Sequence, residues 1–363
     1  MKYITYNFFK KSKELGGNEY CSKNYCKLSG PGYIYLFTPK NDQALKFLLA
    51  RLRYKKSIKN RFAIQYLKLA CHLPKNIVPN VNVKLPKELK DALGELIIIS
   101  GSRMKCFNFR KRVVFTLPLT TIGRERIKIE VDVRKRFKGK INLPRIVHYD
   151  EDVPYLVEEI VGNPLYELNR MSWRLVFDAL KQLIKFYKEN YIKEIFVEKK
   201  IKEISLILMS EKINFKESDF RILESLTKIL HELDCKSLLV TLTHGDFYLG
   251  NLVTDGKIIY ITDWEFPRER LILSDFIYLL FRYYVDTGCI EVLKALLREE
   301  IDPHTEYITK ILNMFEQSFS IHLKNDIVKC YLILGILERI YLFKSYMKKL
   351  IFKRLKRMLP LLK

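Results

Sequence analysis

The pattern of apolar and polar positions changes several times along this chain of 363 residues. Residues 1–30 show no clear period, whereas apolar residues recur every three or four positions from 42 to 73, which predicts helix. The following stretch, CHLPKNIVPNVNVKLPKE, contains three prolines and marks a boundary. From residue 95 the pattern becomes that of strands, and beyond residue 163 it is mainly helical.

Strands surround a single helix in the segment 95–162. GELIIISGSRMKCFNF and RKRVVFTLPL predict two or three strands with turns at 100–102 and 110–112. A helix is expected from about Gly123 to Phe137. INLPRIVHYDED and PYLVEEIVG then predict two more strands that turn at 150–152.

One segment interrupts the helical periodicity of the second half. Residues 172–231 and 271–363 predict helices. Between them, TLTHGDFYLGNLVTDGKIIYITDWE predicts a loop and a tight hairpin with a type I′ turn at Asp255-Gly256. We expect three parts: a basic, partly helical extension (1–94), a small antiparallel-sheet lobe (95–162) and a mainly helical lobe (163–363).

Charge is concentrated at the two ends of the chain. The formal net charge is +24, and residues 1–94 carry 19 Lys and Arg against 5 Asp and Glu. Residues 341–363 carry 8 basic residues and no acidic one. The part between them is nearly neutral, which indicates that the ends bind an anionic partner or surface and that the central part has a different function.

The cysteines and the hydropathy bear on the cellular compartment of the protein. Seven cysteines are scattered without C-x-x-C pairs, which predicts neither a disulfide framework nor a zinc site. The start lacks the apolar core of a signal peptide, and no stretch reaches 18 uncharged apolar residues. We expect a cytoplasmic protein.

Candidate chemistry lies in the segment that interrupts the helices. His244-Gly245-Asp246 is followed, on the same loop, by Asn251, and Asp263 comes twelve residues after the asparagine within Ile-Thr-Asp-Trp-Glu. The pattern H-G-D-x-x-x-x-N followed by D-W-E resembles the aminoglycoside phosphotransferase and choline kinase superfamily of small-molecule kinases. The resemblance covers about residues 95–290 and implies a two-lobed, protein-kinase-like α+β fold.

The resemblance implies ATP and Mg²⁺ as cofactors and an O-phosphotransferase activity. Asp246 would accept or orient the proton of the attacking hydroxyl, and His244 would brace the loop. Asn251 and Asp263 would offer the hard oxygen ligands that Mg²⁺ prefers. A protein kinase proper is not expected, because H-G-D replaces H-R-D and no A-P-E segment follows.

Further residues are implied for the nucleotide. Tyr155-Leu-Val-Glu-Glu-Ile160, with Glu158, Glu159 and Ile160, resembles the hinge that binds adenine through its backbone; an ordinary strand end is the alternative. Glu130 matches the helix glutamate, and Gly101 lies in the expected nucleotide loop. Asp275 resembles the buried aspartate that holds the catalytic loop, with a helix N-cap as an equal alternative.

The chain departs from the family at one position. The strand lysine that pairs with the α/β phosphates falls on Thr116, although Lys105, Arg112 and Arg124 are nearby in sequence. Another base replaces the lysine, the alignment is off by a few residues, or the protein is a weak catalyst. A nucleotide-binding pseudokinase or scaffold is therefore the alternative to an active enzyme.

The basic ends bear on substrate and partners. The tail has apolar residues such as Met347, Leu350, Ile351 and Leu355 between Lys and Arg, a layout that suits either an anionic membrane surface or a last core helix with a basic rim. A kinase that phosphorylates a saccharide or lipid-linked glycan precursor at the inner membrane face would account for both the motif and the basic ends. Nucleic-acid binding through the basic N-terminal region is a weaker alternative, because no signature supports it.

Overall fold

The computed structural model describes residues 2–5, 20–30, 33–38, 42–54, 80–152, 155–190, 192–210, 215–264, 266–297, 303–340 and 345–362. The chain divides into two compact units. The first unit consists of Met1–Lys138, Leu143–Tyr166 and Val253–Glu265. The second consists of Gly139–Asn142, Glu167–Leu252 and Phe266–Lys363.

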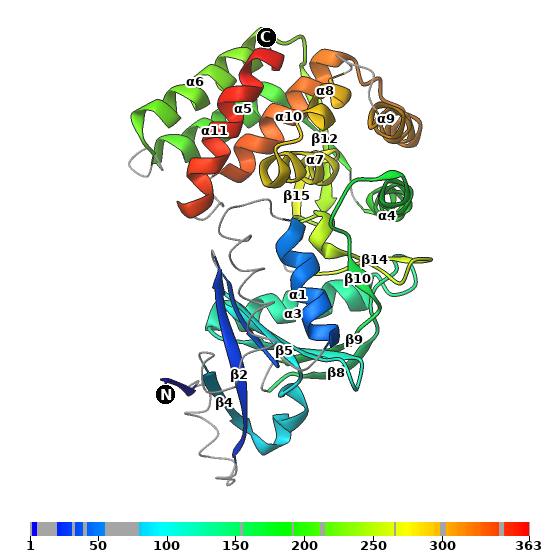
Figure 1. Ribbon diagram of the computed structural model, residues 1–363. Helices are drawn as coiled ribbons and strands as arrows, with labels where there is room; N and C mark the ends of the chain where they lie inside the picture. Colours follow the sequence, from blue (N-terminus) through cyan, green and yellow to red (C-terminus); the bar gives the residue numbers. More distant parts are fainter. Residues whose placement is uncertain are drawn as a thin grey trace. The chain divides into compact units, whose positions relative to one another are not determined.

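The first unit is built on a sheet that, within the described residues, has nine strands in the order β1-β4-β2-β3-β5-β6-β7-β9-β8. Figure 1 labels β2, β4, β5, β8 and β9 of this sheet. Of the strand pairs in the described residues, only β1 and β4 run parallel. The strands are β1 (Lys2–Thr5), β2 (Tyr20–Gly30), β3 (Tyr33–Phe37), β4 (Asn80–Pro86), β5 (Leu96–Ser100), β6 (Arg103–Asn108), β7 (Val113–Pro118), β8 (Ile146–Asp150) and β9 (Tyr155–Glu159). The expected strands of residues 95–162 are β5 to β9, so that expectation is confirmed.

Both faces of the sheet are covered at β5, which explains its uninterrupted apolar sequence. Leu96 and Ile98 pack with helix α1 (Asp42–Tyr54) on one face. Ile97 and Ile99 belong to the cluster on the other face, which includes η3 (Lys87–Ala92). A strand buried on both sides has no polar face, and its sequence therefore shows no alternation.

The same face that α1 covers at β5 is covered at β9 by helix α3 (Thr121–Arg136). The register pairs Ile98 with Lys105, Lys105 with Thr116, and Thr116 with Leu156, so these four side chains form one row on one face. Leu156 is fully buried against Ile127 and Val131 of α3. Polar residues thus occupy the centre of the row, between apolar ends that the two helices cover.

The N-terminal region differs from the prediction. β3 pairs with β5, and β2 and β4 extend the same sheet, so residue 94 is not the boundary of a separate extension. Helix α1 is confirmed as far as Tyr54, and the rest of the predicted helix lies at 55–73, outside the described residues. β2 was missed because its sequence, YCSKNYCKLSG, is largely polar, and only its neighbours in the sheet give it buried partners.

The second unit is mainly helical, as expected. Its helices are α4 (Arg170–Glu189), α5 (Val197–Ser210), α6 (Glu217–Glu232), α7 (Ser274–Thr287), α8 (Glu291–Leu296), α9 (Thr305–Phe319), α10 (Asn325–Ile340) and α11 (Ser345–Leu362). A three-stranded sheet of β11 (Lys193–Phe196), β12 (Ser237–Thr243) and β15 (Arg268–Leu271) was not predicted. β11 interrupts the helical pattern that the sequence predicted from 172 to 231.

The hairpin before Asp263 consists of β13 (Leu252–Thr254) and β14 (Ile259–Ile261), beside the short β10 (Asn163–Pro164). Four residues connect its strands, so the predicted two-residue type I′ turn is wrong. Asp255 instead accepts the backbone N–H groups of Lys257 and Ile258 on its own carboxylate. That bonding stabilises a wider turn.

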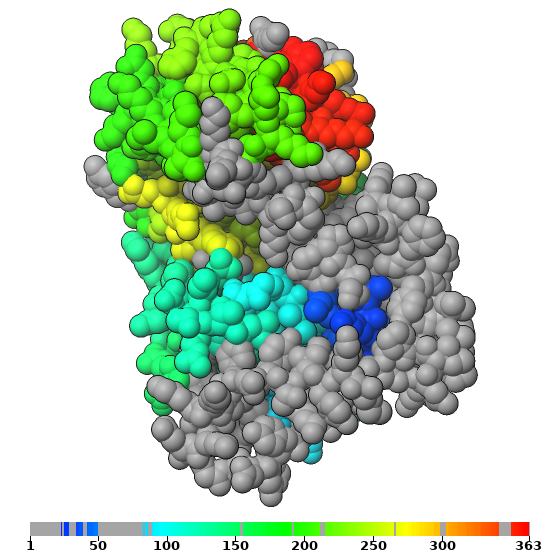
Figure 2. Space-filling model, turned by 90° about the vertical axis from the view of Figure 1, so that its left-hand side faces the viewer, coloured from blue at the N-terminus to red at the C-terminus, as the bar shows by residue number. Residues whose placement is uncertain are grey.

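Helix α11 packs against the rest of the second unit through one apolar face. Ile351, Leu355 and Met358 are fully buried, while Lys353 and Lys356 are exposed. In Figure 2 the red atoms of α11 lie beside the green atoms of the segment that includes α6, and α11 contacts both α6 and α7. Of the two alternatives for the tail, the structure supports the core helix with a basic rim. Among the described residues, every helix is too short or too polar to cross a bilayer.

Candidate active site

The His244-Gly245-Asp246 loop of the second unit follows β12 and is anchored by a buried carboxylate. Asp275, in the first turn of α7, has no exposed surface. Its Oδ2 atom accepts the His244 N–H at 2.7 Å and the Tyr187 hydroxyl at 2.7 Å, and its Oδ1 accepts the Gly245 N–H at 3.1 Å. The predicted loop anchor is confirmed over the N-cap alternative.

Gly245 has a conformation and surroundings that exclude a side chain. Its φ angle is +87°, and an added Cβ would lie 1.8 Å from the carbonyl oxygen of Phe266. The Gly245 carbonyl accepts hydrogen bonds from Arg270 at 2.9 Å and from Arg339 at 2.8 Å. Burial and the neighbouring Arg339 charge lower the pKa of Arg270 to about 10. The loop is therefore fixed by charged groups from helices and strands around it.

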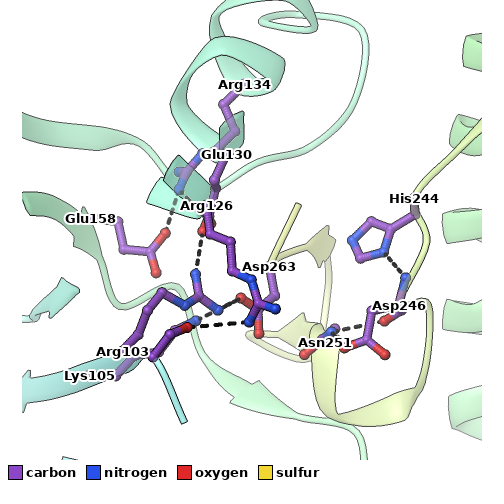
Figure 3. A network of polar contacts seen from close by, with 11 residues as sticks. Arg103, Lys105, Arg126, Glu130, Arg134, Glu158, His244, Asp246, Asn251 and Asp263 are labelled. Carbon is purple, nitrogen blue, oxygen red and sulfur yellow. Dashed lines mark hydrogen bonds and ion pairs between the residues drawn. The ribbon is translucent and has the colours of Figure 1, made fainter. Parts of the chain in front are cut away.

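Asp246 is held by two neighbours in the second unit, one of which, Asn251, is drawn in Figure 3. The Asn251 side-chain nitrogen donates to the Asp246 carbonyl at 2.9 Å and to its Oδ2 at 3.3 Å. The Tyr278 hydroxyl also hydrogen-bonds this carboxylate, and burial together with the Asp246 charge raises the pKa of Tyr278. Because the amide nitrogen of Asn251 faces Asp246, its amide oxygen is turned away from that carboxylate.

His244 lies in the interior of the loop. The residue has no exposed surface, and its Nδ1 accepts the backbone N–H of Asp246 at 3.2 Å. Its ring meets that of Phe247 edge-on at 6.1 Å between centroids. These contacts are those of a residue that braces the loop.

Asp263, in the first unit, has a strained backbone and two cationic partners. Its φ angle is +69°, which is costly for any residue other than glycine. The next residue, Trp264, is buried and donates its ring N–H to the Ile261 carbonyl at 3.1 Å, while Glu265 of the predicted motif lies outside the described residues. The Oδ1 atom of Asp263 lies 2.8 Å from Arg103 and 3.2 Å from Lys105.

The two cations determine the charge state of Asp263. Burial alone would raise the pKa of this carboxyl, but the charges and hydrogen bonds of Lys105 and Arg103 outweigh it and bring the pKa far below its ordinary value. Burial would lower the pKa of Lys105, but the attraction of Asp263 together with that of Glu130 and Glu158 outweighs burial and raises the pKa. Both groups are therefore charged at neutral pH.

A buried chain of ion pairs joins α3 to the sheet (Figure 3). Glu130 of α3 is 1% exposed and pairs with Arg103 at 3.1 Å and with Arg134 at 3.7 Å. Arg134 also pairs with Glu158 of β9 at 2.5 Å and donates to the Pro144 carbonyl. Burial raises the pKa of Glu130, although the charges of Lys105 and Arg103 oppose the shift.

Sequence reasoning selected Glu130 but missed Arg103. The expected partner of Glu130 is a strand lysine at the position of Thr116, and Thr116 is buried on β7. The observed partner, Arg103, comes from the start of β6, two residues after Gly101 of the predicted nucleotide loop. The available signal was the i, i+2 spacing of Arg103 and Lys105, which puts two cations on one face of a strand.

The predicted hinge residues lie at the end of β9, and the predicted nucleotide loop lies between β5 and β6. Glu158 and Glu159 end β9, and the N–H groups of Glu159 and Ile160 donate to the carbonyls of Arg145 and Arg112 at 3.1 and 2.7 Å. The Glu158 side chain is engaged with Arg134. Gly101 has a φ of +54° in the turn between β5 and β6. Adenine binding at these residues stays a prediction.

The donor atoms of Asn251 and Asp263 are of the kind that Mg²⁺ binds. An amide oxygen and a carboxylate are hard ligands, and Mg²⁺ usually takes only one or two protein carboxylates together with substrate phosphates. Among the described residues, no group of three or more His, Cys, Asp and Glu side chains could hold a metal by itself. The two residues belong to different units, so their assignment as ligands rests on the sequence pattern.

No family model and no curated protein matches the chain. Several solved structures do. A thermostable mutant of aminoglycoside phosphotransferase APH(4)-Ia has a TM-score of 0.45 at 12% identity, over 73% of this chain and 89% of that chain. The GDP complex of aminoglycoside 2'-phosphotransferase-IIIa has a TM-score of 0.43 at 14% identity, over 73% and 88%.

A choline/ethanolamine kinase family protein from Mesorhizobium loti has a TM-score of 0.37 at 12% identity, over 72% of this chain and 89% of that chain. At such identities and TM-scores, the function of a matched protein is not transferred to this chain.

Proposed function

We propose that the protein is an ATP-dependent, Mg²⁺-dependent O-phosphotransferase that acts on the hydroxyl group of a small molecule. The observation that carries the proposal is the construction of the His244-Gly245-Asp246 loop. A buried aspartate, two arginines and a tyrosine hold this loop and its carboxylate in place. A loop with so many buried polar partners is costly to build, and it presents one carboxylate, that of Asp246, in a fixed position.

The roles of the residues follow from their chemistry. Asp246 orients the acceptor hydroxyl and takes its proton, while Asn251 and Tyr278 hold the carboxylate in place. Asp263 offers an ionised carboxylate in the first unit, and Asn251 offers an amide oxygen in the second. Mg²⁺, when bound, neutralises charge on the transferred phosphates.

The class of acceptor is the finer part of the proposal. We propose a saccharide or a lipid-linked glycan precursor, because the basic ends of the chain favour an anionic molecule over the cationic aminoglycosides and choline. The proposal needs no insertion of α11 into lipid, since Ile351, Leu355 and Met358 of that helix are buried within the protein.

The test measures phosphotransfer and nucleotide binding separately. Asp246→Asn should lower turnover by about a hundredfold or more and leave ATP binding intact, because the carboxylate acts on the acceptor. Asp263→Asn should remove the Mg²⁺-dependent part of the thermal stabilisation by ATP, which is about 2.7 kcal/mol at a hundred times the dissociation constant. Asp234→Asn, at an exposed position, is the matched control.

Thr116 favours one second candidate, a nucleotide-binding pseudokinase. A pseudokinase would be stabilised by ATP without Mg²⁺. It would show no phosphotransfer, so Asp246→Asn would not change its activity. Failure of millimolar ATP to raise the unfolding temperature of the wild type would contradict both readings. It would direct attention to partners of the basic ends, including nucleic acid, whose binding would fall steeply with salt.

A further inference from the structure

The position of Thr116 has a cationic neighbour on the adjacent strand. Lys105 of β6 is the residue directly opposite Thr116 in the antiparallel pair of β6 and β7. Side chains that are directly opposite point to the same face, and their Cβ atoms lie about 5 Å apart. An amine carried by residue 105 therefore starts one strand away from residue 116 and extends from the same face of the sheet.

A second cation lies on the same face of β6. Arg103 is two residues before Lys105, so its side chain points to the same side, and it lies opposite Pro118. Its guanidinium bonds Glu130 through one terminal nitrogen, at 3.1 Å, and Asp263 through the other, at 2.8 Å. Glu130 therefore has the ion-pair partner that a lysine at position 116 would have supplied.

We propose that β6 divides between two residues the work expected of one lysine on β7: Arg103 pairs with Glu130 and positions α3, and Lys105 binds the α/β phosphates of the nucleotide. This inference rests on the proposed function, because it presupposes that the first unit binds a nucleotide. It identifies the base that takes the place of the lysine absent at Thr116.

Burial and geometry decide which cation meets the phosphates. The Arg103 side chain is 8% exposed and is held between two carboxylates. The Lys105 side chain is 24% exposed and reaches Asp263 with one of the three donors of its ammonium group. A buried guanidinium with both ends engaged is a fixed structural cation, whereas an ammonium on a flexible stem can take a phosphate oxygen as a further acceptor.

The neighbouring side chains add to this assignment. Lys105 lies in the row of Ile98, Thr116 and Leu156, whose apolar ends are covered by α1 and α3. A charge in such a row needs an anionic partner, and Asp263 is the partner that the structure provides. A polyphosphate beside Asp263 would place a second anion within reach of the same ammonium group.

The test compares the binding of ADP with that of adenosine, which lacks the phosphates, to the full-length protein by calorimetry. Lys105→Thr should weaken ADP binding by about tenfold to a hundredfold, the loss of one charge-assisted hydrogen bond or two, and leave adenosine binding unchanged. Adding Thr116→Lys to Lys105→Thr returns the amine to β7 and should restore ADP binding at least in part. Lys111→Thr is the control, because Lys111 is exposed and pairs with Asp91.

The outcomes separate this inference from the proposed function. The assignment of Lys105 would be overturned, while the proposed function stands, if Lys105→Thr bound ADP as tightly as the wild type does. It would also be overturned if Lys105→Thr weakened the binding of ADP and of adenosine equally. Absence of ADP binding to the wild type would overturn both. Should Lys105→Thr fail to fold, Lys105→Gln keeps the length of the side chain and gives the same comparison of ADP with adenosine.

Discussion

At the scale of single residues, three of the candidate site residues have positive φ angles, namely Gly101, Gly245 and Asp263. Gly245 adopts φ +87° at no steric cost, whereas Asp263 adopts φ +69° as a residue with a side chain. The contacts of Arg103, Lys105 and Trp264 hold the Asp263 segment in this conformation. Such strain persists only where surrounding contacts determine the conformation, which is common at sites that bind ligands.

Gly245 should not tolerate a side chain. Gly245→Ala places a methyl group against the Phe266 carbonyl and adds the cost of a left-handed alanine, so unfolding in urea should show a loss of at least about 2 kcal/mol. Gly139→Ala is a matched control in the same unit. Its φ is +80° with nothing within 4 Å of the added Cβ, and it should lose only about 1 kcal/mol. Equal losses for the two variants would show that the contact with Phe266 is unimportant.

The residues of the loop could be predicted from the sequence because they are close together along the chain. His244, Asp246 and Asn251 fall within eight consecutive residues, and their spacing is visible without knowledge of the fold. Arg103 could not be found in the same way. Its pairing with Glu130 and Asp263 depends on the register of β6 against β7 and on the position of the hairpin that ends at Asp263, and no local pattern reports either.

At the scale of elements, α3 is tied to the sheet by charge as well as by apolar packing. Its apolar contact with β9 is small, formed by Ile127, Val131 and Leu156. Beside it run the ion pairs from Arg103 through Glu130 and Arg134 to Glu158. Removing one partner of such a chain leaves an uncompensated buried charge, which costs much more than the pair contributes.

Arg134→Met should destabilise the protein strongly. Glu158 loses its ion pair and Glu130 loses one of two, so the free energy of unfolding should fall by about 3–5 kcal/mol. Lys111→Met breaks an exposed pair with Asp91 and should change it by less than about 1 kcal/mol. Chemical denaturation of both variants measures the difference, and a small effect of Arg134→Met would mean that the ion pairs of Arg134 contribute little to holding α3.

Elements were predicted well where apolar residues decide the structure and poorly where sheet neighbours do. LIIIS of β5 and VVFTLP of β7 are buried strands by their composition. β2 buries Tyr25 and Cys26 but carries Ser, Lys and Asn as well, and Lys23 reaches the Gly94 carbonyl at 2.6 Å with its ammonium group. A long polar side chain that bonds a distant carbonyl can occupy a strand without any local sign of it.

At the scale of the whole chain, the N-terminal region and the predicted sheet lobe share one sheet. β3 contributes Tyr35 and Phe37 to the same apolar cluster as Leu96 and Ile98. Removal of β1 to β4 would expose this cluster and leave β5 as an unpaired edge strand. A long, apolar, unpaired edge is a template for aggregation.

A chain that starts at residue 95 should therefore fail to fold into a soluble protein, even though it keeps every motif residue. Deletion of residues 1–5 takes away only the edge strand β1 and should leave a monomeric, folded protein. Expression of both forms, followed by size-exclusion chromatography, makes the comparison. A soluble, monomeric 95–363 would show that the N-terminal strands are dispensable.

The order of the strands in the sheet also sets an order in time. β2 and β3 are joined by a short connection and can pair as soon as both exist, but β4, the other neighbour of β2, arrives about fifty residues later. Bringing β4 to β2 costs chain entropy before their contacts form, and this cost slows folding. During synthesis, the edge of β2 that pairs with β4 stays unpaired until residues 80–86 have been made. In this interval the nascent chain is exposed to pairing with a wrong strand.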